Sequence, residues 1–93
     1  YAMKYDIELT KIAEKHILRF KKSGQKQLLK KIEKLIDELE IHPTTGTGKP
    51  EQLKHYETPT WSRRIDKQHR LVYQIFENEV LVLIIAACGH YED

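Results

Sequence analysis

The spacing of hydrophobic residues changes along the chain, from one short alternating stretch and two helical stripes to repeated alternation in the second half. Residues 3–9 alternate between polar and apolar positions, which predicts a first strand. Thr10 suits a helix N-cap, and the residues after it predict a helix that extends to about Lys22. The expected buried side of this helix consists of Ile12, Ala13, Ile17 and Phe20.

A second helix is expected from about Gln25 to Ile41, after a break at Ser23-Gly24. It has the strongest periodicity in the chain, with apolar residues at Leu28, Leu29, Ile32, Leu35, Ile36 and Leu39. Pro43 disfavours helical geometry at the residue before it and so ends the helix. The short break between the two helices predicts that they form an antiparallel pair.

The remainder predicts an irregular segment followed by three strands. Residues 43–59 are rich in Gly, Pro and Thr, and the strands are expected at about 60–65, 69–76 and 80–88. The last strand is apolar on both faces, which favours a central strand covered on both sides. The order βααβββ indicates an α+β fold, with two N-terminal helices packed on a mainly antiparallel sheet. Residues 1–93 are expected to form a single domain, with Tyr1 and Ala2 before Met3 as an expression remnant.

Basic residues are concentrated in the helical half, although the formal net charge of the 93 residues is only +2. Nine Lys or Arg residues lie between Lys11 and Lys34, whereas none occurs from Leu71 to the end. This asymmetry indicates a basic face that meets a polyanion, and the alternative is a Lys-rich helix that is simply solvated. A single cysteine, charges throughout the first twenty residues and no membrane-length apolar run favour a cytoplasmic location, with no membrane partner.

Three familiar kinds of site are poorly supported. The loop GTGKPE is not a phosphate-binding loop, because Pro50 follows Lys49 where such a loop needs Ser or Thr. The five histidines lack ligand spacing and the cysteine stands alone, so neither a metal nor another cofactor is expected. Cys88 ends an apolar strand, which favours a buried and unreactive thiol.

What remains is a set of acid, base and cationic side chains gathered by the predicted hairpins: Glu51, Arg63, Arg64, His69, Arg70 and His90. Metal-free RNA cleavage needs a base for the 2′-hydroxyl, an acid for the leaving 5′-oxygen, and cations for the charge that develops on phosphorus. A carboxylate, an imidazole and guanidinium groups can fill these roles. The alternatives are that Glu51 pairs with a nearby lysine and that His90 is a surface residue at the chain end.

Strand alternation separates the two neighbouring arginines. Arg64 shares a face with Ser62 and is expected to point outward, whereas Arg63 points to the side of Trp61 and Ile65. Arg63 is therefore ranked below Arg64 as a candidate site residue, and it is expected to be a structural or rim cation. Trp61 is expected in the core.

The segments PTTGTGKPEQLKH, WSRRIDKQHRLVY and IIAACGHY resemble the Txe/YoeB subgroup of the RelE-like toxins of bacterial type II toxin–antitoxin systems. The resemblance covers nearly the whole chain in the right order. It implies a fold like that of microbial ribonucleases and a metal-free mRNA endonuclease that acts in the ribosomal A site. It also implies mRNA, the ribosome and a YefM/Axe-like antitoxin as partners, and it is compatible with a homodimer.

By this resemblance Glu51 is the general base and His90 the general acid, while Arg64 and Arg70 hold the scissile phosphate. The RNA-binding set that it implies is Lys49, Lys54, Arg63, His69 and Tyr91. Two departures stand out, because many relatives have a basic residue at the position of Cys88 and end close to the residue that matches Tyr91. The competing readings are a non-catalytic module that binds antitoxin or ribosome and a ribosome-independent ribonuclease.

Overall fold

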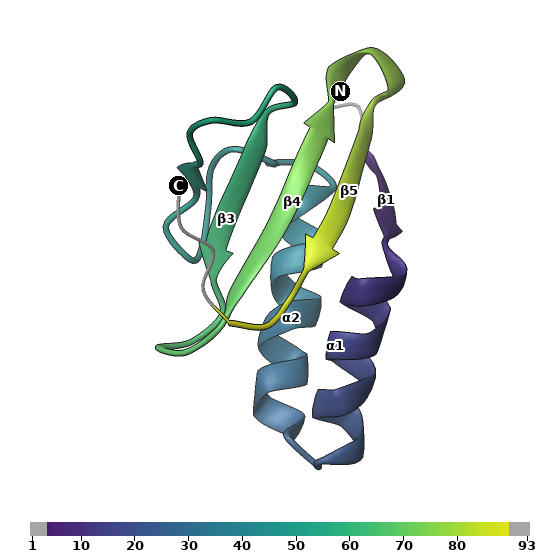
Figure 1. The fold of residues 1–93 in the computed structure, drawn as a ribbon, viewed down its shortest axis with the longest axis vertical. Helices are drawn as coiled ribbons and strands as arrows, with labels where there is room; N and C mark the ends of the chain where they lie inside the picture. The colour runs from purple at the N-terminus through teal and green to yellow at the C-terminus, as the bar shows by residue number, and fades with distance from the viewer. Residues whose placement is uncertain (1–3, 90–93) are drawn as a thin grey trace.

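The computed structural model describes residues 4–89 and shows two helices against one face of a five-stranded sheet (Figure 1). The elements are β1 Asp6–Leu9, α1 Lys11–Lys22, α2 Lys26–Leu39, β2 Glu51–Gln52, β3 Thr60–Arg64, β4 Arg70–Phe76, the 3-10 helix η1 Glu77–Glu79, and β5 Leu81–Ala86. The strand order is β1-β5-β4-β3-β2, and the β1–β5 pair is parallel while the other pairs are antiparallel. The predicted α+β fold, with helices first and a mainly antiparallel sheet, is confirmed.

The start of α1 follows the predicted capping, whereas its buried face is narrower than expected. The Thr10 hydroxyl oxygen accepts a hydrogen bond from the Ala13 N–H at 3.2 Å, which supplies a partner for one free N–H of the first turn. Ala13 and Phe20 are buried, but the expectation for Ile12 is wrong, because this side chain is 58% exposed. One residue rotates a helix by about 100°, so Ile12 lies off the stripe that Ala13 begins.

The main core lies between the helices and one face of the sheet. It joins Ile32, Leu35 and Leu39 of α2 to residues of β4 and β5, among them Tyr73 and Ile84. The prediction that the last strand is covered on both sides is wrong. The alternate residues Leu81 and Leu83 are only half-buried, because both helices lie on the other face (Figure 1).

The segment expected to be irregular contains the short edge strand β2, in which Glu51 pairs with Ser62 of β3. Two glycines with positive φ lead into it, Gly46 at 120° and Gly48 at 88°. A Cβ atom on Gly46 would collide with Glu38 Oε1, and one on Gly48 would lie 2.8 Å from the Arg64 carbonyl oxygen. The glycines therefore allow the loop to run against α2 and β3 before it reaches Glu51.

Arg63 is fully buried and fully hydrogen-bonded. Its guanidinium donates to Tyr73 Oη at 3.1 Å, Glu38 Oε1 at 3.1 Å, the carbonyls of Thr47 at 3.4 Å and Thr45 at 2.6 Å, and the carbonyl of His42. These contacts use the five donors of the group. The inclusion of Arg63 among the RNA-binding residues is therefore wrong, because RNA has no access to a side chain with no exposed surface. Arg63 is instead a structural cation, which was the alternative that strand alternation predicted.

Replacement of Arg63 with alanine is expected to lower the free energy of unfolding by about 3–5 kcal/mol, because it removes the donor that the Glu38 carboxylate and three carbonyls share. The exposed neighbour gives a matched control, and Arg64→Ala should change stability by less than about 0.5 kcal/mol. Urea denaturation of both variants measures the difference. Equal losses would contradict the structural role of Arg63.

Glu38 should make stability depend on pH in the acidic range. Its pKa is lowered by the hydrogen bond from the Thr47 N–H, and also by the positive charge of Arg63. A folded-state pKa below the ordinary value of 4.5 means that the stabilisation is present above that pH and is lost as pH falls through the folded-state pKa. Glu38→Gln should thus be less stable than wild type near neutral pH, and the difference in the free energy of unfolding should narrow as the pH falls below 4.5. Glu40→Gln, beside the exposed Lys4, should show no such convergence.

Candidate functional site

Three charged residues of the proposed chemistry share the face of the sheet that carries no helix. Glu51 is opposite Ser62, and Arg64 is opposite Arg70. Cross-strand partners lie on the same face, as do residues two apart on a strand, so Glu51, Arg64 and Arg70 all point to one side. Val72, opposite Ser62, belongs to a small cluster with Leu53 and Ala86 that is separate from the helix-covered core.

Their spacing suits a single small anion. Directly opposite residues have Cβ atoms about 4.5–5.5 Å apart, and diagonal neighbours such as Glu51 and Arg64 are separated by about 7–8 Å. Glu51 and Arg64 are exposed and Arg70 is half-buried. Within residues 4–89 neither Arg64 nor Arg70 forms an ion pair. The two guanidinium groups can therefore meet an anion from outside the protein.

The structure places the two lysines of the proposed RNA-binding set at opposite ends of β2. The Gly48 carbonyl accepts a hydrogen bond from the Arg64 N–H at 2.7 Å, so the backbone of Lys49 lies beside that of Arg64. Leu53 donates its N–H to the Thr60 carbonyl at 2.8 Å, and Lys54 follows it at the far end of the strand. Both lysines are exposed. Lys49 can contact the same anion as Arg64, whereas Lys54 can contact only a longer ligand.

The backbone before His90 is held at the start of β4. Arg70 donates its N–H to the Gly89 carbonyl at 3.1 Å, and Gly89 donates its N–H to His69 Nδ1 at 3.1 Å. The His69 ring also contacts Phe20 edge-on, with centroids 5.0 Å apart. His90 and Tyr91 lie outside the described residues. Gly89 is joined directly to His90, so the described chain ends next to Arg70.

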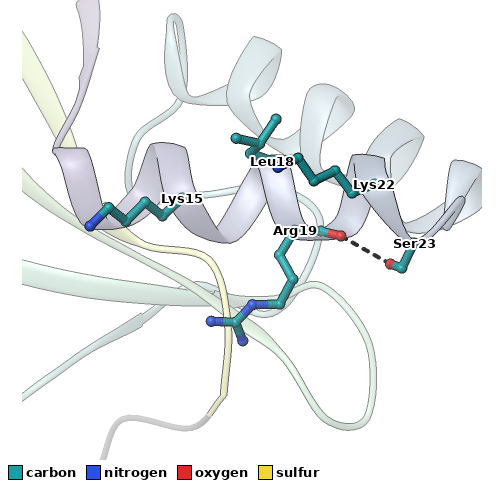
Figure 2. Close-up of a pocket in the computed structure, with 5 residues that line it drawn as sticks. All are labelled: Lys15, Leu18, Arg19, Lys22 and Ser23. Atoms are coloured by element: carbon teal, nitrogen blue, oxygen red, sulfur yellow. Dashed lines mark hydrogen bonds between the residues drawn. The ribbon is translucent and has the colours of Figure 1, made fainter.

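A cationic cleft on α1 lies close to the same segment (Figure 2). It has a volume of about 510 Å³ and is lined by Lys15, Leu18, Arg19, Lys22 and Ser23. In Figure 2 the Arg19 side chain points away from the helix toward the chain after β5, and its Nη1 is 3.8 Å from Cys88 Sγ. A guanidinium therefore lies beside residue 88, where the chain itself has no basic side chain. Cys88 is half-buried.

Sequence reasoning missed two residues that organise the site. His16 was considered only as a metal ligand, yet its Nδ1 accepts a hydrogen bond from the Ala87 N–H at 3.1 Å. Glu38 was passed over, although an acid one residue before the buried Leu39 is a natural partner for an arginine on the core side of a strand. That acid at the edge of an apolar stripe was the available signal for Glu38, and His16 had none.

Neither a metal centre nor a membrane span is formed by the described part of the chain. Within residues 4–89 no group of three His, Cys, Asp or Glu side chains is arranged to hold a metal ion. Over the same range, no helix combines the length and the apolar character that crossing a membrane requires.

Comparison with known proteins gives consistent matches. The model of the YoeB-like toxins of bacterial type II toxin–antitoxin systems matches residues 12–91. Toxin YoeB of Escherichia coli K12 is 46% identical over 66 residues, which cover 71% of this chain and 75% of that protein. A YoeB/ParE toxin from Agrobacterium tumefaciens superposes with a TM-score of 0.84 at 29% identity, over 92% of this chain and 99% of that one.

Structures from Staphylococcus aureus add two assemblies. The YoeB dimer gives a TM-score of 0.81 at 32% identity, and the YoeB–YefM complex gives 0.78 at 31% identity. Each covers 95% of this chain and 99% of the matched chain. An archaeal RelE in complex with RelB, at 17% identity and a TM-score of 0.77, shows the same fold.

Proposed function

The chain belongs to the YoeB-like toxins of bacterial type II toxin–antitoxin systems, and from this premise we propose that it is a ribosome-dependent endonuclease that cuts mRNA in the ribosomal A site. The observation that supports the proposal most directly is the placement of Glu51, Arg64 and Arg70 on the helix-free face of the sheet. One carboxylate and two neighbouring guanidinium groups, which form no ion pair within residues 4–89, suit phosphodiester chemistry.

The proposed reaction is an internal transfer of the phosphoryl group. Glu51 removes the proton of the 2′-hydroxyl, and the 2′-oxygen forms a bond to the adjacent phosphorus. The bond between phosphorus and the 5′-oxygen breaks, and that oxygen takes a proton from His90. The products are a 2′,3′-cyclic phosphate and a 5′-hydroxyl, so atoms and charge balance without a metal or another cofactor.

Arg64 and Arg70 stabilise the charge that builds on phosphorus. A guanidinium is planar and presents two parallel N–H groups to two phosphate oxygens, which a lysine cannot do. The two side chains are cross-strand neighbours, so they can bind the same phosphate from two directions. Their net contribution is greatest when the phosphate carries its additional charge in the transition state.

The remaining RNA contacts are proposed for Lys49, Lys54, His69 and Tyr91. The backbone of Lys49 lies beside that of Arg64, so the Lys49 side chain is suited to bind the scissile phosphate or the one next to it. Lys54 suits a more distant phosphate, because it lies at the other end of β2. His69 keeps one ring nitrogen for RNA, since Gly89 uses only Nδ1.

The proposed partners are mRNA, the ribosome and an antitoxin of the YefM kind. The Staphylococcus aureus YoeB–YefM complex supports the antitoxin, and the YoeB dimer from the same organism supports a homodimer. Residues 1–93 are proposed to act as one toxin domain. Because its proposed substrate is mRNA on translating ribosomes, the proposed place of action is the cytoplasm.

Loss of the Glu51 carboxylate should abolish cleavage while the fold and ribosome binding persist. Glu51→Gln keeps the shape of an exposed side chain but removes the base, so cleavage should fall by about 10²–10⁴-fold. Primer extension on mRNA translated in a purified system, with and without ribosomes, measures it. Glu57→Gln, which changes another exposed carboxylate in the segment between β2 and β3, should cut at the wild-type rate.

Two other results of this assay would contradict the proposal and favour its alternatives. Wild-type protein that sediments with ribosomes but leaves mRNA intact would indicate a non-catalytic binding module. Naked RNA cut at a comparable rate would indicate a ribosome-independent ribonuclease. A break that requires ribosomes but survives Glu51→Gln would retain the toxin function and exclude Glu51 as the base.

Lysines of α2 are expected to dock on ribosomal RNA, so ribosome affinity should fall steeply with salt. Lys26 and Lys30 are exposed and one helical turn apart. Replacing both with glutamine should lower the slope of log affinity against log salt by roughly 0.7–0.9 for each phosphate that the variant no longer neutralises. Sedimentation over a salt series measures it. Lys4→Gln should leave the slope unchanged, and an unchanged slope for the α2 variant would exclude this surface.

A further inference from the structure

Two imidazoles hold the backbone that leads to the chain end. The Ala87 N–H donates to His16 Nδ1 at 3.1 Å, and the Gly89 N–H donates to His69 Nδ1 at 3.1 Å. The two histidines come from different parts of the fold, one from the middle of α1 and the other from the residue before β4. The segment 87–89 is therefore attached both to the helical layer and to the start of β4.

These bonds satisfy backbone groups that have left the sheet ladder. β5 ends at Ala86, and Ala87 is completely buried, so its N–H needs an internal partner. His16 supplies that partner across 71 residues of sequence. Gly89 is held through both of its backbone groups, because its carbonyl also accepts from the Arg70 N–H at 3.1 Å.

An N–H group can donate only to an imidazole nitrogen that carries no proton. Both histidines must therefore be neutral, with the proton on Nε2, for the two bonds to exist. For His16 the surroundings favour this state, because burial lowers its pKa and the positive charge of Arg19 lowers it further. Among residues 4–89, other titratable or charged groups near the pair include Cys88 beside Arg19, and Asp66 and Arg70 on either side of His69.

We propose that His16 and His69 are positioning residues, which hold residues 87–89 as neutral hydrogen-bond acceptors and so fix the backbone from which His90 extends. Its catalytic consequence rests on the proposed function, because His90 is the general acid only if the protein cuts RNA. Gly89 and His90 share a peptide bond, so a displacement of Gly89 moves the starting point of the acid. Misplacement of a reacting group by about 1 Å can cost on the order of 100-fold in rate.

The hydrogen bonds can be tested directly, without reference to activity. In the 15N-labelled full chain, an N–H···N bond transmits a scalar coupling between the amide nitrogen and the acceptor nitrogen. Couplings from Ala87 to His16 Nδ1 and from Gly89 to His69 Nδ1 are expected at neutral pH, and both should vanish as the imidazoles are protonated. Protonated Nδ1 atoms at neutral pH, or the absence of both couplings, would overturn the proposal.

The positioning role is tested by single-turnover cleavage on ribosomes from about pH 5.5 to 8. His16→Ala should lower the rate by on the order of 10–100-fold with ribosome sedimentation unchanged. His16→Asn should restore cleavage, since its amide oxygen can accept from the Ala87 N–H. Because asparagine cannot be protonated, the cleavage rate of this variant relative to wild type should rise toward the acidic end of the range, below the ordinary histidine pKa of 6.5, since burial lowers the pKa of His16. For the exposed controls His42→Ala and His55→Asn, the cleavage rate relative to wild type should not change with pH.

The outcomes separate this inference from the function on which it rests. Couplings present, with His16→Ala cutting at the wild-type rate, would overturn the positioning role and leave the endonuclease intact. Loss of cleavage that His16→Asn does not restore would also count against it, because any general loss of packing would have that effect. Couplings present in a wild-type protein that never cuts mRNA would refute the proposed function, and with it any catalytic role for the two histidines.

Discussion

The buried guanidinium of Arg63 is the contact on which the arrangement of the site depends. From β3 it reaches Glu38 of α2, Tyr73 of β4 and three carbonyls of the loop 42–47. A charge without solvent contact is tolerated only where hydrogen bonds replace its hydration, and here every donor has an acceptor. The loop so held continues through Gly48 into β2, so the position of Glu51 follows from how this cation is satisfied.

The same residue also determines which face of β3 meets solvent. Successive side chains of a strand alternate, so a slip of one residue would bury Arg64 and expose Arg63. A slip that moved Ser62 into the place of Arg63 would leave the carboxylate of Glu38 and the loop carbonyls without a donor, and it would bury Arg64 in the place where Ile65 packs. The internal ion pair therefore opposes that slip and supports the register in which Arg64 and Arg70 face outward together. Two adjacent arginines have opposite roles because one of them has a partner inside the protein.

Local signals predicted most of the fold, and long-range pairings account for what they missed. The Thr10 cap, the two helical stripes and the alternation of residues 60–76 each depend on neighbours close in sequence. The β2 pairing, the contact of Glu38 with Arg63 and that of His16 with Ala87 join residues that are distant in sequence. The position of Glu38 at the edge of an apolar stripe marks it as a partner for some buried cation, but no local pattern indicates which residue each of these groups meets. The error at Ile12 has another origin, since hydrophobicity alone does not show where a stripe ends.

The candidate site was predictable in part for the same reason. Arg64 and Arg70 flank one hairpin turn, so alternation and a short connection suffice to place them on one face. The position of Glu51 depends instead on a loop whose course is set by Gly46, Gly48 and the buried guanidinium. The family resemblance implied Glu51 as the general base, but it carried no information on what holds this residue on the helix-free face.

The start of β4 serves two purposes through separate atoms of the same residues. The side chain of Arg70 faces the proposed phosphate position, while its backbone N–H binds the Gly89 carbonyl. His69 likewise uses Nδ1 for Gly89 and leaves its other nitrogen unassigned. The cation that would receive the phosphate and the backbone that leads to the proposed acid are thus anchored within one peptide unit of each other. Any movement of this strand end would shift both together, which keeps their separation constant even if the surrounding loops move.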